Sequence, residues 1–266
     1  AVLVLNTPDT CRKAELTREI SKKWQEGEIT EIYTEKETEI PPLEPARPDH
    51  IKLVEPRNAP KRGKGGTLKS RMAMIHSLVH IESVAIDLSW DIIARYPSNN
   101  LPKEFYDDFV KVAQDEAKHY SMLKSRLEEL GGQYGDFEAH SGLWQSALQT
   151  KDSLVNRLVI EHTVHEGRGL DVTPLTIERL RKNGDETSAL LLEEILEDEL
   201  THVTAGLKWF KYLYQKDHNN ASQEEIISHF HHIVRENFYG NLKPPFNHSM
   251  RERAGMTKEW YMPLTT

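Results

Sequence analysis

Cysteine is nearly absent from this sequence, because Cys11 is the only one among 266 residues. One thiol excludes an intrachain disulfide, a zinc knuckle and an iron–sulfur cluster. Apolar runs long enough for a membrane span are also lacking, and the opening residues 1–5 are too short for the core of a signal peptide. We therefore expect a protein of the reducing cytoplasm that does not enter the membrane.

Excess positive charge and strand-like alternation are missing as well. The net charge of −8 argues against broad binding of nucleic acid, since proteins that follow a phosphate backbone usually carry an excess of Lys and Arg. Hydrophobic residues make up 38% and charged residues 29%, a balance typical of a soluble globular protein. Without strand patterns, the predicted fold class is all-α.

Apolar residues at helical spacing predict a succession of helices. A short helix over residues 8–27 is followed by a Pro-rich, extended arm over 41–60. Four long helical patterns come next, over residues 68–96, 102–130, 152–168 and 186–214. The third is expected to break near Gly167, Gly169 and Pro174 and to resume over 175–182.

Two short strings repeat the same pattern of charged residues. Asp115-Glu116-Ala-Lys-His119 and Asp198-Glu199-Leu-Thr-His202 each place a carboxylate and an imidazole three residues apart, on one face of a helix. One such pair is a weak signal, but two copies inside long amphipathic segments are a strong one. Inward-facing Glu-x-x-His pairs on two helices, with one Glu from each of two others, build the two-metal site of ferritin-like bundles.

The two remaining helices must each supply a carboxylate to complete such a site. Glu82 lies in the apolar stripe of the first long helix and precedes Glu116 by 116 − 82 = 34 residues. Glu166 precedes Glu199 by 199 − 166 = 33 residues, whereas Glu161 precedes it by 38. Because Glu161 and Glu166 lie about 140° apart on an α-helix, the matching spacing favours Glu166 and leaves Glu161 to a surface pair with Arg157.

Other polar residues are candidates for supporting roles. Asp115 and Asp198 are expected to fix the metal-bound His of the opposite helix pair, with solvated helix positions as the alternative. His162 or His165 could join the metal site, although hydrogen-bonded core or surface histidines are the simpler interpretation, also for His76 and His80 on the first long helix. The segment 57–71 holds six basic residues and no acidic one.

Within this basic segment Lys61, Arg62 and Lys64 are candidate contacts for an anionic substrate, and the alternative is a solvated loop.

Several ordered motifs resemble a known family. They are His80-Ile-Glu82, Asp115-Glu-Ala-Lys-His119, Tyr134-Gly-Asp-Phe-Glu-Ala-His140, Glu166-Gly-Arg-Gly-Leu-Asp-Val-Thr-Pro174, Asp198-Glu-Leu-Thr-His202, Pro245-Phe-Asn247 and Arg253-Ala-Gly255. Over roughly residues 45–260 the chain is similar to bacterial ferritin-like proteins grouped as a domain of unknown function, and more distantly to di-iron hydroxylases of tRNA and of quinone biosynthesis. The resemblance also assigns the ligand role to Glu166 rather than Glu161.

Together these observations predict three segments. Residues 1–66 form a helix and an arm packed on the bundle, 67–216 a ferritin-like four-helix bundle, and 217–266 a C-terminal helical extension covering it. The predicted metal ligands are Glu82, Glu116, His119, Glu166, Glu199 and His202.

The expected function is that of an O₂-activating oxidoreductase with two Fe ions, or with Mn or both metals. It would hydroxylate or oxidise a small, anionic organic substrate as a monomer or dimer, with an electron-donor protein as a further partner. The alternatives are a non-enzymatic iron or manganese store and a tRNA-modifying hydroxylase.

Overall fold

A computed structural model describes residues 1–32, 40–59, 63, 65–96, 101–239 and 241–265. The chain is mostly helical, and it divides into two compact units, Ala1–Gln145 and Ser146–Thr266. None of the helices in these described ranges is long and apolar enough to cross a membrane. The limits of the three segments expected from the sequence, at residues 66 and 216, stay a prediction.

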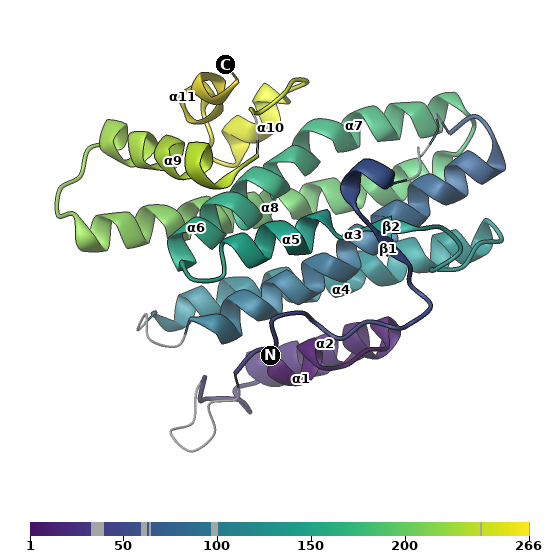
Figure 1. The fold of residues 1–266 in the computed structure, drawn as a ribbon, viewed down its shortest axis with the longest axis horizontal. Coiled ribbons are helices and arrows are strands. Elements are labelled where there is room, and N and C mark those ends of the chain that lie inside the picture. Colours follow the sequence, from purple (N-terminus) through teal and green to yellow (C-terminus); the bar gives the residue numbers. More distant parts are fainter. Residues whose placement is uncertain (33–39, 60–62, 64, 97–100, 240, 266) are drawn as a thin grey trace. The chain divides into compact units, whose positions relative to one another are not determined.

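Two long helices dominate the first unit. Helix α3 (Leu68–Arg95) begins at a reciprocal cap, in which the backbone N–H of Ser70 donates to Thr67 Oγ1 and that of Thr67 donates to Ser70 Oγ. Helix α4 (Lys103–Glu129) packs along α3 and ends before Gly131, whose φ of +88° suits a residue without a side chain. Figure 1 shows these two helices side by side, and both begin and end within a residue of their predicted limits.

Shorter elements surround this pair. Helices α1 (Val2–Leu5) and α2 (Thr10–Gln25) pack against it, and the predicted arm contains only the strand β1 (Leu53–Val54) and the 3₁₀ turn η1 (Pro56–Asn58) among its described residues. Strand β1 pairs in parallel with β2 (Ala139–His140), so one small strand pair exists where none was predicted. Two residues per strand are too few to give a periodic pattern.

The second unit is built around one interrupted helix and a long partner. Helix α6 (Leu154–Val159), the π-helical turn η3 (Ile160–His165) and helix α7 (Glu166–Lys182) follow one another without a gap and pack on α8 (Glu186–Asp217). The predicted break at Gly167, Gly169 and Pro174 is therefore wrong. Leu170 and Ile177 are buried on either side of Pro174, so packing of this face maintains the helix through its breakers.

The C-terminal part of the second unit is also helical, as predicted. It comprises α9 (Gln223–Asn237), α10 (His248–Arg253), α11 (Lys258–Tyr261) and the 3₁₀ turn η4 (Met262–Leu264). Met250 and Ala254 bury apolar surface against Leu170 and Val203, which joins α10 and the residue that follows it to α7 and α8. Helix α5 (Gly142–Gln149) spans the boundary of the two units.

Candidate metal centre

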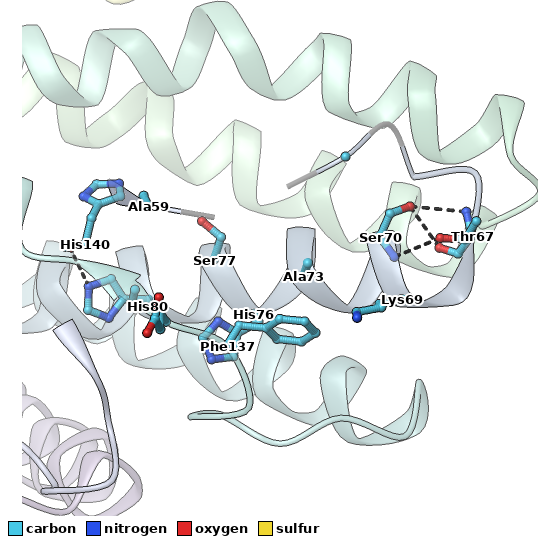
Figure 2. A pocket seen from close by; sticks show the side chains of 13 residues that line it. Ala59, Thr67, Lys69, Ser70, Ala73, His76, Ser77, His80, Phe137 and His140 are labelled. Carbon is cyan, nitrogen blue, oxygen red and sulfur yellow. Dashed lines mark hydrogen bonds between the residues drawn. The ribbon is translucent and has the colours of Figure 1, made fainter. Parts of the chain in front are cut away.

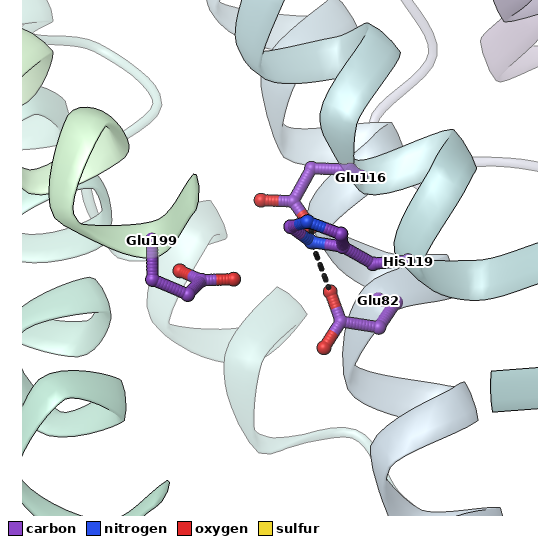
Figure 3. A group of neighbouring side chains, drawn as sticks. All are labelled: Glu82, Glu116, His119 and Glu199. Carbon is purple, nitrogen blue, oxygen red and sulfur yellow. Dashed lines mark ion pairs between the residues drawn. The ribbon is translucent and has the colours of Figure 1, made fainter. Parts of the chain in front are cut away.

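Three of the predicted ligands meet inside the first unit. Glu82 on α3 and Glu116 and His119 on α4 are 6%, 1% and 0% exposed, and each offers a ligand atom within 4.8 Å of the others. His119 Nδ1 lies 3.6 Å from both Glu82 Oε2 and Glu116 Oε2 (Figure 3). Two carboxylates and an imidazole therefore converge in a place from which water is excluded.

The electrostatics of this group favour a cation. Burial, reinforced by the neighbouring Glu116 carboxylate, raises the pKa of Glu82 well above its usual range, although its contact with His119 acts in the opposite direction. Two buried carboxylates side by side are costly unless protons or a positive ion neutralise them.

The second unit brings three more predicted ligands together. Glu166 is the first residue of α7, and Glu199 and His202 lie one turn apart on α8, again with ligand atoms within 4.8 Å of one another. His202 Nδ1 lies 3.5 Å from Glu199 Oε2. Glu199 and His202 are buried at 7% and 2% exposure, and Glu166 is half-buried. The repeated strings thus fold into two similar triads, and these buried Glu and His residues could bind metal.

Glu161 differs from its prediction as a surface residue. It is 1% exposed and accepts a hydrogen bond of 2.6 Å from Ser146 Oγ, while the buried Arg157 donates to Thr150 Oγ1 and to the Ala147 carbonyl. The turn η3 contains Glu161 and ends directly before Glu166. In a π-helix the backbone hydrogen bond joins residues five apart, which therefore lie almost above one another. The separation of 140° that an α-helix would give Glu161 and Glu166 does not hold here.

The two histidines of the π-turn have different surroundings. His165 Nε2 lies 3.0 Å from Ser146 Oγ and 4.0 Å from Glu161 Oε2, so Ser146 connects the imidazole with the Glu161 carboxylate. His162 is 2% exposed within the same turn. Neither belongs to the group of ligand atoms around Glu166.

The remaining predicted site residues are placed as follows. Asp115 is buried and forms an ion pair with Lys111, one turn earlier on its own helix. Asp198 is half-buried on α8, and its predicted role stays a prediction. Lys61, Arg62 and Lys64 lie outside the described residues.

A cavity of about 430 Å³ in the first unit was not predicted from the sequence. Figure 2 shows its floor, where Lys69, His76, Ser77 and His80 follow one face of α3. Glu82 lies about 200° around the helix from His80, so this face points away from the triad.

Hydrogen bonds fix the protonation of two histidines in this cavity wall. His80 Nε2 lies 3.1 Å from the His140 carbonyl, to which it must donate, so His80 Nδ1 accepts from the Tyr134 hydroxyl at 2.8 Å. His76 Nε2 accepts the Gly135 N–H at 2.9 Å. Burial is the main cause that lowers the pKa of His76 to about 4 and that of His80 to about 3. Both are therefore neutral, hydrogen-bonded histidines, as the simpler interpretation predicted.

The sequence is similar to those of a known protein family. Residues 6–262 match the family described as "Protein of unknown function (DUF455)". The chain belongs to this DUF455 family. A relative from Haemophilus influenzae, named "Uncharacterized protein", is 33% identical over 220 residues, which cover 80% of this chain and 74% of the relative. No solved structure matches the chain. The match to DUF455 includes all six predicted ligands.

Proposed function

We propose that this protein is a two-metal oxidoreductase, with one triad of ligands for each ion. The two triads would combine in a ferritin-like four-helix arrangement of α3, α4, α6–α7 and α8. The observation that carries the proposal is the repetition of a buried Glu-x-x-His pair with one further Glu, once in each unit. Oxygen and imidazole donors in this proportion suit iron, manganese or both, and iron is our first choice.

The donor set fits a pair of divalent ions in charge as well as in type. The four carboxylates of Glu82, Glu116, Glu166 and Glu199 would balance the four positive charges of two such ions. The imidazoles of His119 and His202 would add neutral nitrogen ligands. Ferrous ions would supply the reducing electrons for O₂.

The residues around the triads would support oxidation chemistry in two ways. Apolar residues within two turns of Glu116 and His119 on α4 would keep water away, since Phe109, Val112, Ala113 and Leu123 are all at most 4% exposed. The Ser146 hydroxyl, in contact with Glu161 and His165, can hold a proton between a carboxylate and an imidazole close to Glu166 in the sequence. An organic substrate, expected to be small and anionic, and an electron donor remain part of the proposal.

Storage of iron or manganese is the competing function, because the same triads would serve it. Modification of tRNA is less consistent with a net charge of −8. Consumption of O₂ beyond that needed to oxidise the bound iron, on addition of a reductant and cell extract, separates an oxidase from a store.

The metal site itself is tested by elemental analysis after anaerobic loading with Fe(II). We expect about two ions per chain, by analogy with two-metal bundles. Glu116→Ala and Glu166→Ala should each lose at least one ion, whereas Glu161→Ala should retain both. Glu104→Ala is the matched control, since Glu104 is exposed on α4. Absence of tightly bound metal from the unaltered protein, or equal loss in Glu104→Ala, would contradict the proposal.

A further inference from the structure

A second cavity, of about 290 Å³, lies within the second unit and is separate from its triad. One wall is a stripe of the π-turn and α7 that includes Val164, His165, Arg168 and Asp171. Glu166 lies two positions before Arg168, about 200° away around the helix. The cavity therefore belongs to the face of α7 that is turned away from the Glu166 carboxylate.

The deep part of the cavity is a buried ion pair. Arg251 Nε and Nη2 donate to the two oxygens of Asp171 at 2.8 and 2.7 Å, and the side chains of the pair are 3% and 0% exposed. The backbone N–H of Asn247 donates to Asp171 Oδ1 at 2.9 Å. Because these donors satisfy Asp171, its charge is compensated within the wall and does not oppose an anion in the cavity.

Among the described residues of this lining, Arg168 and Lys243 have no carboxylate near them other than Asp171. Arg168 Nη1 donates to the carbonyls of Lys243 and Pro245 at 2.7 and 3.0 Å and lies 3.6 Å from Asp171 Oδ2, already held by Arg251. Within the described part of the chain, Nε and Nη2 of Arg168 have no hydrogen-bond partner. Lys243 is exposed at the rim of the cavity. The lining therefore has an excess of positive charge, and two backbone carbonyls already hold the Arg168 side chain in place.

Aromatic rings supply the rest of the wall. Phe238 and Phe246 line the cavity together with Tyr239, which is 85% exposed. The Phe238 ring centre lies 5.6 Å from that of His165, and the Arg251 guanidinium carbon lies 5.3 Å from the Phe246 ring centre. Flat apolar surfaces next to unpaired cationic N–H groups favour a ligand that is both planar and negatively charged.

We propose that this cavity binds a small aromatic carboxylate, whose ring lies between Phe238 and Phe246 and whose carboxylate accepts hydrogen bonds from Arg168 and Lys243. A monocyclic acid suits a cavity of about 290 Å³. The site needs no metal ion, so its occupation does not depend on the proposed two-metal function.

The proposal is tested with 4-fluorobenzoate, followed by ¹⁹F NMR during titration of the metal-free protein. We expect saturable binding with a Kd on the order of 1 mM or below, in the range open to a ligand of this size. Arg168→Gln should weaken binding about tenfold, because a charge-assisted hydrogen bond is lost. Arg179→Gln should bind as the unaltered protein does, since Arg179 is exposed on the same helix but does not line the cavity.

Competitors distinguish the two parts of the proposed ligand. Benzoate should displace the probe, whereas cyclohexanecarboxylate and inorganic phosphate should do so at least fivefold less well. Equal competition by phosphate would reduce the site to a general anion site and overturn the proposal. Absence of saturable binding, or equal weakening by Arg168→Gln and Arg179→Gln in variants with unchanged circular dichroism, would do the same.

Discussion

Acidification should destabilise this protein through two buried histidines, His76 and His80. Their pKa values of about 4 and about 3 lie below the ordinary value of 6.5 that they regain on unfolding. Between pH 6.5 and pH 4 the unfolded chain therefore binds more protons at these positions than the native chain. The free energy of unfolding rises with pH when the unfolded state binds more protons, so the contribution of these two histidines to it must fall as the pH is lowered through this window.

The magnitude follows from proton uptake by the unfolded state. At pH 5 an exposed histidine with a pKa of 6.5 gains about 2 kcal/mol by protonation, whereas the buried ones gain almost nothing. Each histidine should therefore lower the free energy of unfolding by at most about 2 kcal/mol between pH 7 and pH 5. The main structural reason is burial, which disfavours the charged imidazolium, and protonation of His76 Nε2 would also remove the hydrogen bond that this nitrogen accepts from the Gly135 N–H.

Urea unfolding of the metal-free protein at pH 7 and pH 5, followed by circular dichroism, measures this effect. In His80→Gln the loss between the two pH values should be about 2 kcal/mol smaller than in the unaltered protein. His232→Gln is the control, because His232 is 62% exposed and pairs with Glu236 on α9. The total pH dependence also contains the opposite contribution of Glu82, whose raised pKa makes the native state bind protons, so the variants and not the unaltered protein test the reasoning. It is refuted if His80→Gln and His232→Gln change the pH dependence equally.

Two further predictions concern packing and charge. Lys13→Met should lower the free energy of unfolding by about 3 kcal/mol, because it leaves the fully buried Asp87 with Arg47 as its one remaining cation. Lys22→Met, in an exposed pair, should cost less than about 1 kcal/mol. Equal costs of the two substitutions in chemical denaturation would contradict this prediction. Gly206→Ala should destabilise by at least about 3 kcal/mol, since its Cβ would lie 2.0 Å from the His162 carbonyl oxygen. Gly169→Ala, with no atom within 4 Å of the new Cβ, should instead stabilise α7 by up to about 1 kcal/mol, and the opposite order of thermal midpoints would disprove the packing argument.

The long helices could be predicted because their signals are local. Apolar spacing and end signals such as Pro102 and Gly131 placed α3, α4 and α8 close to their observed limits. Contacts between distant segments leave no comparable trace. Lys13 and Asp87 are 74 residues apart, and their burial together is evident only once α2 packs on α3. The cavity floored by α3 is equally invisible, because its other wall comes from residues 137–140.

The candidate ligands were also predictable, since their spacing repeats, but the backbone that carries one of them was not. A π-turn leaves the sequence looking like an ordinary helix, because one extra residue per turn changes hydrogen bonds rather than residue types. The geometric argument against Glu161 assumed 3.6 residues per turn and fails within η3. What still favours Glu166 is the spacing to Glu199 and its place in the group of ligand atoms.

The position of the π-turn is fixed by its partner helix. Gly206 lies one turn after His202 on α8. Because Gly206 has no side chain, the His162 carbonyl and Thr163 Oγ1 can pack closer to its backbone than they could if a Cβ were present. Thr163 Oγ1 in turn donates to the Leu158 carbonyl at 2.8 Å, five residues earlier. The same stretch of α8 therefore carries two triad ligands and the glycine against which the π-turn packs. Because η3 ends directly before Glu166, any shift of this turn along α8 would move Glu166 relative to Glu199 and His202. The precision of the second triad thus depends on a glycine that has no ligand atom of its own.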